Sequence, residues 1–199
     1  MVATPLSTAL LTKQPYHVIE LLLSQGADIN NDPVIWKTHY MSRLVRSSNT
    51  QLLELLLSHG MDPNKTDEHE LGLLHQALLC RDDICVAVVL LRYGAYKWSN
   101  DHNVDLIWVA YNNQNIEKMS LLLRYGSDIN NTDEHGWTML HHAARKDDAD
   151  MVKWLLDHGA KSDIRCSRGE LPIHKAIHHD GPDVMEIIGL LGGSIYALL

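Results

Sequence analysis

A short apolar phrase that ends in glycine recurs along this chain at a nearly constant interval, and it limits the possible folds more than any other feature. The sequence numbers of the six closing glycines differ by 34, 34, 32, 33 and 33: Gly26, Gly60, Gly94, Gly126, Gly159 and Gly192. A fixed period of this length indicates stacked structural repeats. Each phrase is typical of a helix C-terminus, because leucines at core spacing precede a glycine that adopts the left-handed conformation readily. The copy at Gly192 is the weakest.

A second phrase, rich in Thr, Pro, Leu, His and Ala, predicts a first helix upstream of each glycine. Its best copies occupy residues 4–9, 72–77, 138–143 and 171–176. Trp108 and Ser42 hold the histidine position in the copies at 105–110 and 39–44, so the fourth and second repeats are degraded. The polar segments that follow the glycines are rich in Asp, Asn and Gly, which favour turns. They predict a hairpin-like finger between repeats.

This pattern resembles the ankyrin repeat over essentially all 199 residues. The resemblance implies an all-α solenoid of stacked helix-turn-helix units with hairpin-like fingers. We expect a single domain, 1–199, with repeats at about 1–32, 33–66, 67–99, 100–132, 133–165 and 166–199. The resemblance also implies that His75, His141 and His174 hydrogen-bond neighbouring backbone across repeats. Where the family has a Gly-His turn between its two helices, this chain has Asp and Asn, which we expect to cap the second helix.

Composition narrows the partners and the compartment. The 17 Lys plus Arg against 25 Asp plus Glu give a formal net charge of −8, which argues against binding to nucleic acid or to anionic membranes. No apolar run approaches the roughly 20 residues of a membrane-spanning helix. The three cysteines include no CxxC pair and are interpreted as free thiols in a reducing compartment, the cytoplasm or the nucleus.

Sequence motifs for catalysis and for cofactors are absent. The chain contains no GxxxxGK[ST], HExxH or GxSxG, so we expect no enzyme activity and no cofactor. Zinc is an alternative raised by 13 histidines, since His174 and His178 are spaced to share one helical face. No cysteine or carboxylate stands at a matching spacing to complete such a site. We therefore expect no bound metal.

The expected function is a non-enzymatic scaffold or adaptor that binds a protein or peptide on the concave surface formed by its fingers and first helices. Two alternatives remain open. The chain could be an inhibitor or host-directed effector that blocks an enzyme or a transcription factor. It could also be the substrate-recognition arm of a larger, ubiquitin-ligase-like assembly.

Positions that the repeat scaffold leaves free are the candidates for partner binding. In register they are Trp36, Glu68, His69, Leu71, Asp101, His102, Val104, Asn112, Glu134, His135, Trp137, Arg145, Lys146, Arg168 and His178. Trp137 is central, because a tryptophan left in water is costly unless a partner covers it.

With Leu71 and Val104, Trp137 is predicted to form an apolar ridge with an acidic rim: Glu68, Asp101 and Glu134. This ridge predicts a partner with basic residues around an apolar anchor, although the C-terminal end is more basic. The alternative is that the ridge side chains pack on the adjacent finger.

Overall fold

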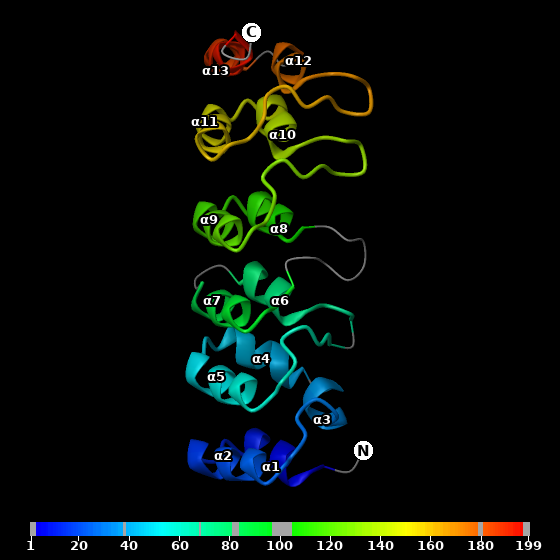
Figure 1. Cartoon of the computed structure of the whole chain (residues 1–199), viewed down its shortest axis with the longest axis vertical. Coiled ribbons are helices and arrows are strands. Elements are labelled where there is room, and N and C mark those ends of the chain that lie inside the picture. Colours follow the sequence, from blue (N-terminus) through cyan, green and yellow to red (C-terminus); the bar gives the residue numbers. More distant parts are fainter. Residues whose placement is uncertain are drawn as a thin grey trace. The chain divides into compact units, whose positions relative to one another are not determined.

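The computed structural model describes residues 3–37, 39–67, 69–80, 84–96, 105–178 and 181–196 (Figure 1). Within these ranges the chain forms helices and two isolated β-bridges, without a named strand, so the all-helical class is confirmed. No helix in the described ranges has the length and hydropathy needed to cross a membrane. The chain divides into two compact units, Met1–Gly126 and Ser127–Leu199, and each is described by itself. The single domain expected from the repeats remains a prediction.

Unit one contains four helix pairs. They are α1 (Pro5–Leu11) with α2 (Tyr16–Ser24), α4 (Tyr40–Arg46) with α5 (Thr50–Ser58), α6 (Leu73–Leu79) with α7 (Cys85–Arg92), and α8 (Ile107–Asn112) with α9 (Ile116–Arg124). First helices contact first helices, α4 with α6 and α6 with α8, and α5 contacts α7 in the second row. The predicted core leucines Leu56 and Leu122 are completely buried there. Stacking thus buries the apolar face that a single repeat leaves open.

Unit two contains the last two pairs, α10 (Met139–Arg145) with α11 (Ala149–Asp157) and α12 (Pro172–Ile177) with α13 (Val184–Tyr196). Helix α10 packs on α12, and α11 packs on α13. The prediction that Gly192 ends its helix is wrong, because α13 continues to Tyr196. No Asp-rich turn follows Gly192, whereas each of the other five glycines has φ between 83° and 90° and ends a helix.

The second repeat departs from the expected finger, because a short extra helix, α3 (Pro33–Lys37), replaces the hairpin. The Asp32 carboxylate starts it by accepting the backbone N–H groups of Val34 and Ile35 at 2.9 and 3.3 Å. Trp36 is only 6% exposed, and its indole N–H donates to the carbonyl of Ile29 at 2.8 Å. The prediction that Trp36 faces a partner is therefore wrong, since the helical turn carries this side chain into the core.

Asparagines at the start of the polar segments join consecutive repeats. The Asn30 amide donates to the carbonyl of Gly60 and accepts the N–H of Asp62, both at 2.8 Å. Asn130 makes the same two bonds in unit two, to Gly159 at 3.3 Å and from Lys161 at 2.7 Å. Each asparagine therefore fixes the helix end of the next repeat and sets the spacing between repeats.

In repeats one, two, four and five, the turn between the two helices contains a left-handed residue that is not glycine. Lys13, Ser48, Gln114 and Asp147 have φ between 51° and 59° there. A side chain in this conformation costs roughly 1–2 kcal/mol.

This strain can be removed at Gln114, which is exposed. Glycine would relieve the strain but would also gain more entropy on unfolding than glutamine does. We therefore expect Gln114→Gly to raise the free energy of unfolding by about 0.5–1 kcal/mol. Urea denaturation measures the change, with Gln114→Ala as the control, and a glycine variant no more stable than the alanine variant would contradict it.

Candidate protein-binding site

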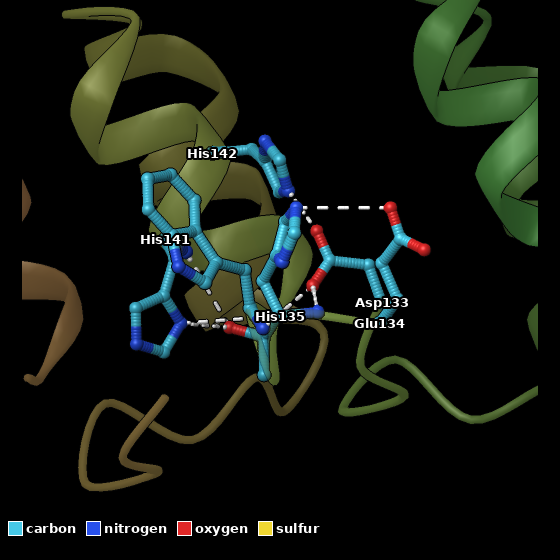
Figure 2. Close-up of polar contacts among 7 residues, drawn as sticks. Asp133, Glu134, His135, His141 and His142 are labelled. Atoms are coloured by element: carbon cyan, nitrogen blue, oxygen red, sulfur yellow. Dashed lines mark hydrogen bonds and ion pairs between the residues drawn. The ribbon is translucent and has the colours of Figure 1, made fainter. Parts of the chain in front are cut away.

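The finger of repeat five is held by one carboxylate at its base (Figure 2). Asp133 accepts the backbone N–H groups of His135 and Trp137 on Oδ1, both at 2.9 Å, and its own N–H donates to the Trp137 carbonyl at 2.9 Å. Asp suits this position because its short side chain bonds the backbone just downstream. Repeat three repeats the arrangement, with Asp67 accepting the N–H groups of His69 and Leu71. The predicted hairpin-like finger is confirmed in these two repeats.

Gly136 completes this turn and is required there for two reasons. Its φ of 71° lies in the left-handed region, and a Cβ would lie 2.9 Å from the backbone nitrogen of Ser167. That nitrogen donates to the carbonyl of His135 at 3.1 Å, so the fingers of repeats five and six are hydrogen-bonded. The finger therefore has one defined shape within unit two.

A side-chain bond ties the same finger to its first helix. His142 on α10 contacts Oδ2 of Asp133 through Nε2 at 2.8 Å, as Figure 2 shows. Burial alone would raise the pKa of Asp133, but the hydrogen bonds from His142, Trp137 and His135 exceed it, and the pKa is lowered. Repeat three makes the equivalent contact with a neutral donor, Gln76 to Asp67, at 3.0 Å.

Trp137 lies half-buried at the base of the finger, against side chains of α10 and α12. Its ring centroid is 5.0 Å from that of His142. The guanidinium carbon of Arg145 lies 5.3 Å, and the Nζ of Lys175 4.4 Å, from the ring centroid. Cation–π contacts of this kind stabilise both partners when they are partly desolvated. The indole thus positions two cations.

His141 is buried completely and confirms the cross-repeat bond that the family resemblance implied. Its Nδ1 accepts the N–H of Thr138 at 3.1 Å, so Nε2 carries the proton and donates to the Glu170 carbonyl at 3.1 Å. Burial is the largest influence on this imidazole and lowers its pKa. His174 is exposed and, within the described residues, bonds only its own repeat, through the N–H of Leu171.

The two partly or fully buried histidines make stability depend on pH. Burial also lowers the pKa of His75, so for His75 and His141 the unfolded chain binds a proton more readily than the folded chain. Their contribution to stability is complete above the unfolded pKa, about 6.5, and is lost as pH falls toward the folded pKa. We expect the urea midpoint to fall from about pH 7 to about pH 5. His141→Ala should flatten this profile, and an equally steep profile in that variant would contradict the assignment.

A groove with a volume of about 740 Å³ lies beside Trp137 within unit two. We call it the Trp137 groove. Five of the predicted partner-binding residues line it: His135, Trp137, Arg145, Arg168 and His178. Fingers and first helices both contribute, because His135 and Arg168 belong to fingers and Arg145 belongs to α10. The groove can therefore receive a side chain or an extended segment from outside.

Lys175 and Glu170 also line this groove. The repeat register leaves Glu170 free at the surface of repeat six, but it did not predict Lys175. They form an ion pair in which the Lys175 side chain is 9% exposed and that of Glu170 28% exposed. Lys175 occupies the position that follows the histidine of the first-helix phrase, where Gln76 and His142 stand in repeats three and five. A polar side chain thus stands at this position in three repeats, and this recurrence could have identified Lys175 as a candidate.

A second groove of about 740 Å³ lies within unit one, beside Leu71. His69 and Leu71, both predicted, line it together with Arg43, Arg46 and the exposed Leu79. The rings of His69 and His39 are stacked at 5.9 Å. In the described residues, a groove thus lies at the junction of finger and first helix in each unit.

The remaining predicted residues fall into three groups. Glu134 and Lys146 are exposed on the finger and at the C-cap of α10, and Asn112 lines a smaller hollow of about 550 Å³. Trp36 is buried and is excluded. Four lie outside the described residues: Glu68, Asp101, His102 and Val104. Of the three residues of the expected apolar ridge, the structure describes Leu71 in unit one and Trp137 in unit two, and the ridge itself stays a prediction.

Among the residues that the structure describes, no three His, Cys, Asp or Glu side chains are placed to hold a metal ion. The i, i+4 pair His174 and His178 is exposed. Cys80, Cys85 and Cys166 form no disulfide within the described residues.

Comparison with known proteins identifies a family pattern in this chain. A family model described as Ankyrin repeats (3 copies) matches residues 106–193. Palmitoyltransferase AKR1 of Lachancea kluyveri is 28% identical over 177 residues, which are 86% of this chain and 22% of that protein. Protein phosphatase 1 regulatory subunit 27 of Homo sapiens is 36% identical over 80 residues, 40% of this chain and 49% of that protein. The chain thus spans less than half the length of either relative.

The solved structure of the ankyrin repeat domain of Bcl-3, a member of the IkappaB protein family, has the same fold. It matches with a TM-score of 0.70 at 24% identity and covers 96% of this chain and 86% of that chain.

Proposed function

We propose that this chain, in which ankyrin repeats match residues 106–193, binds another protein or a peptide along its fingers and first helices, and that it catalyses no reaction of its own. The ankyrin repeat is a protein-interaction module, and its working surface is the set of positions that the stack leaves free. The observation that carries the proposal is the Trp137 groove, which gathers five such positions around one half-buried tryptophan. Rigid elements hold it, because the finger is hydrogen-bonded to α10 and to the next finger.

Adaptor and regulatory roles fit this proposal equally, and the relatives favour a module that serves an enzyme. One relative is described as a regulatory subunit of a phosphatase, and in the palmitoyltransferase the matched segment is 22% of the protein. A subunit or arm that recruits a substrate to an enzyme, or blocks the enzyme, has the same physical requirement as an adaptor: a preformed surface.

The proposed compartment and partner class follow from the chain's own chemistry. Three free cysteines support a reducing compartment, the cytoplasm or the nucleus. The net charge of −8 supports a protein partner rather than nucleic acid or membrane. A partner with basic residues was predicted from three acidic rim positions, of which Glu134 alone lies in the described residues, with an 87% exposed side chain.

Affinity capture with a matched pair of tryptophan variants tests the proposed surface. We expect Trp137→Ala to weaken capture of specific partners about tenfold or more, because a tryptophan at the centre of an interface contributes about 2 kcal/mol or more. Trp154→Ala is the control, since Trp154 is half-buried in the same unit, stacks on His158 at 4.0 Å and does not line the groove.

Circular dichroism should show that both variants stay folded. Partners retained equally by wild type and Trp137→Ala would exclude this surface.

A further inference from the structure

The Trp137 groove is positively charged on an acidic protein. Among its lining residues are three permanent cations, Arg145, Arg168 and Lys175, and one carboxylate, Glu170. The whole chain has a net charge of −8. A local excess of one sign, opposite to that of the whole molecule, attracts a ligand of the other sign to that place and to few others.

Two of these cations are available to a ligand. Lys175 is used internally, because it pairs with Glu170 and lowers the pKa of that carboxyl mainly through their hydrogen bond. Arg145 and Arg168 form no ion pair with any part of the chain that the structure describes, and both are exposed. Arg168 also lowers the pKa of Glu170 by charge attraction, but Lys175 has the larger effect on that carboxyl. The uncompensated charge of the groove therefore resides on two guanidinium groups.

Arg145 is positioned as well as charged. Its guanidinium carbon lies 5.3 Å from the ring centroid of Trp137, and a guanidinium placed over an aromatic ring keeps its N–H donors for other partners. Such donors match the two oxygens of a carboxylate in a bidentate pair. The hydroxyl of Ser167 on the same wall is a further donor to an anion.

We propose that the Trp137 groove binds an acidic peptide segment, whose Asp or Glu carboxylates contact Arg145 and Arg168 while the indole of Trp137 contacts an apolar part of the same segment. This inference rests on the proposed function and names the partner's chemistry at this surface. Single-stranded nucleic acid also carries negative charge, but its affinity depends on many phosphate contacts. Two available guanidinium groups on a chain of net charge −8 favour the short acidic segment.

The test selects binders from a displayed library of random twelve-residue peptides, with the full chain as target. We expect the enriched peptides to carry an excess of Asp and Glu over Lys and Arg. The Arg145→Gln/Arg168→Gln double variant should bind the best of them about tenfold or more weakly by calorimetry. Raising the salt from low to about 0.5 M should also weaken binding, since exposed charge pairs are screened.

The matched control is the Lys153→Gln/Lys161→Gln double variant, which removes the same charge from exposed positions of unit two outside the groove. It should bind the peptide as wild type does. The proposal is overturned by enrichment of neutral or basic peptides, by a selection without binders, by equal losses in both double variants, or by tighter binding of a twelve-nucleotide single-stranded RNA. If partner capture still depends on Trp137 in those cases, the proposed protein-binding function is supported and only the proposal of an acidic peptide is rejected.

Discussion

Replacing Lys118 with alanine is expected to lower the free energy of unfolding by about 3–5 kcal/mol. Lys118 lies on α9 and is 1% exposed. Its ammonium donates to the carbonyls of Ala77, Leu78 and Cys80, at 3.4 and 2.9 Å for the first two. These carbonyls end α6, where the last turn lacks intrahelical donors and the helix dipole is negative. Alanine removes both the charged donor and the buried aliphatic stem.

The variant Lys118→Met separates these two losses. Met151 holds the same place in repeat five. Lys118 lies three positions after its helix N-cap, Asn115, and Met151 lies three positions after Asp148. Both residues donate their backbone N–H to the N-cap side chain at 2.9 Å. Methionine should therefore fit the space and restore packing but not the donor. We expect an intermediate loss of about 2 kcal/mol in urea denaturation. A methionine variant as stable as wild type would show that the ammonium contributes nothing to the end of α6.

Features that depend on neighbours in the sequence could be predicted well. The asparagine and aspartate residues between helices were expected to cap, and Asn115 and Asp148 do so. The ankyrin resemblance and the helical class are confirmed, and five of the six periodic glycines end a helix as predicted. Local chemistry is sufficient for these assignments, since a cap and its helix lie within four residues of each other.

Features that depend on a specific tertiary contact could not be predicted in this way. The segment at Trp36 stands at a finger position of the repeat register, yet Asp32 caps it into a helix and the Trp36 indole donates to the Ile29 carbonyl. Lys118 has the charge of a surface residue, and the carbonyls at the end of α6 stabilise its ammonium inside the fold. Burial of a polar side chain is tolerated when it finds a hydrogen-bond partner inside the fold. The repeat register does not show which group that partner will be.

The charge of the candidate site could be predicted in part, because Arg145, Lys146 and Arg168 already marked the C-terminal end as basic. The structure brings Arg145 and Arg168 to one groove beside Trp137, and their role in partner binding stays a prediction. The pairing of Lys175 with Glu170 in repeat six, which leaves the excess charge on the two arginines, was not predicted. Reading each repeat separately therefore could not show that Arg145 and Arg168 remain uncompensated.

The second large effect is expected for His141→Ala, with a loss of about 3 kcal/mol in the free energy of unfolding. The imidazole is completely buried and joins two repeats, accepting from Thr138 and donating to the Glu170 carbonyl. Alanine leaves the Thr138 N–H without this acceptor and opens a cavity between α10 and α12, and both effects destabilise a packed interior.

His174→Ala is the matched control, because His174 holds the same position in repeat six but is exposed and accepts only the Leu171 N–H. We expect its loss to stay below about 1 kcal/mol, the typical value of one exposed cap. Above about pH 7 the lowered pKa of His141 keeps this buried imidazole neutral, so urea denaturation of both variants there compares the two sites directly. The expected difference in the free energy of unfolding between the two variants, about 2 kcal/mol, measures the contribution of burial and of the hydrogen bond between repeats. Equal losses of free energy in both variants would mean that the bond from His141 to Glu170 adds nothing beyond the local cap.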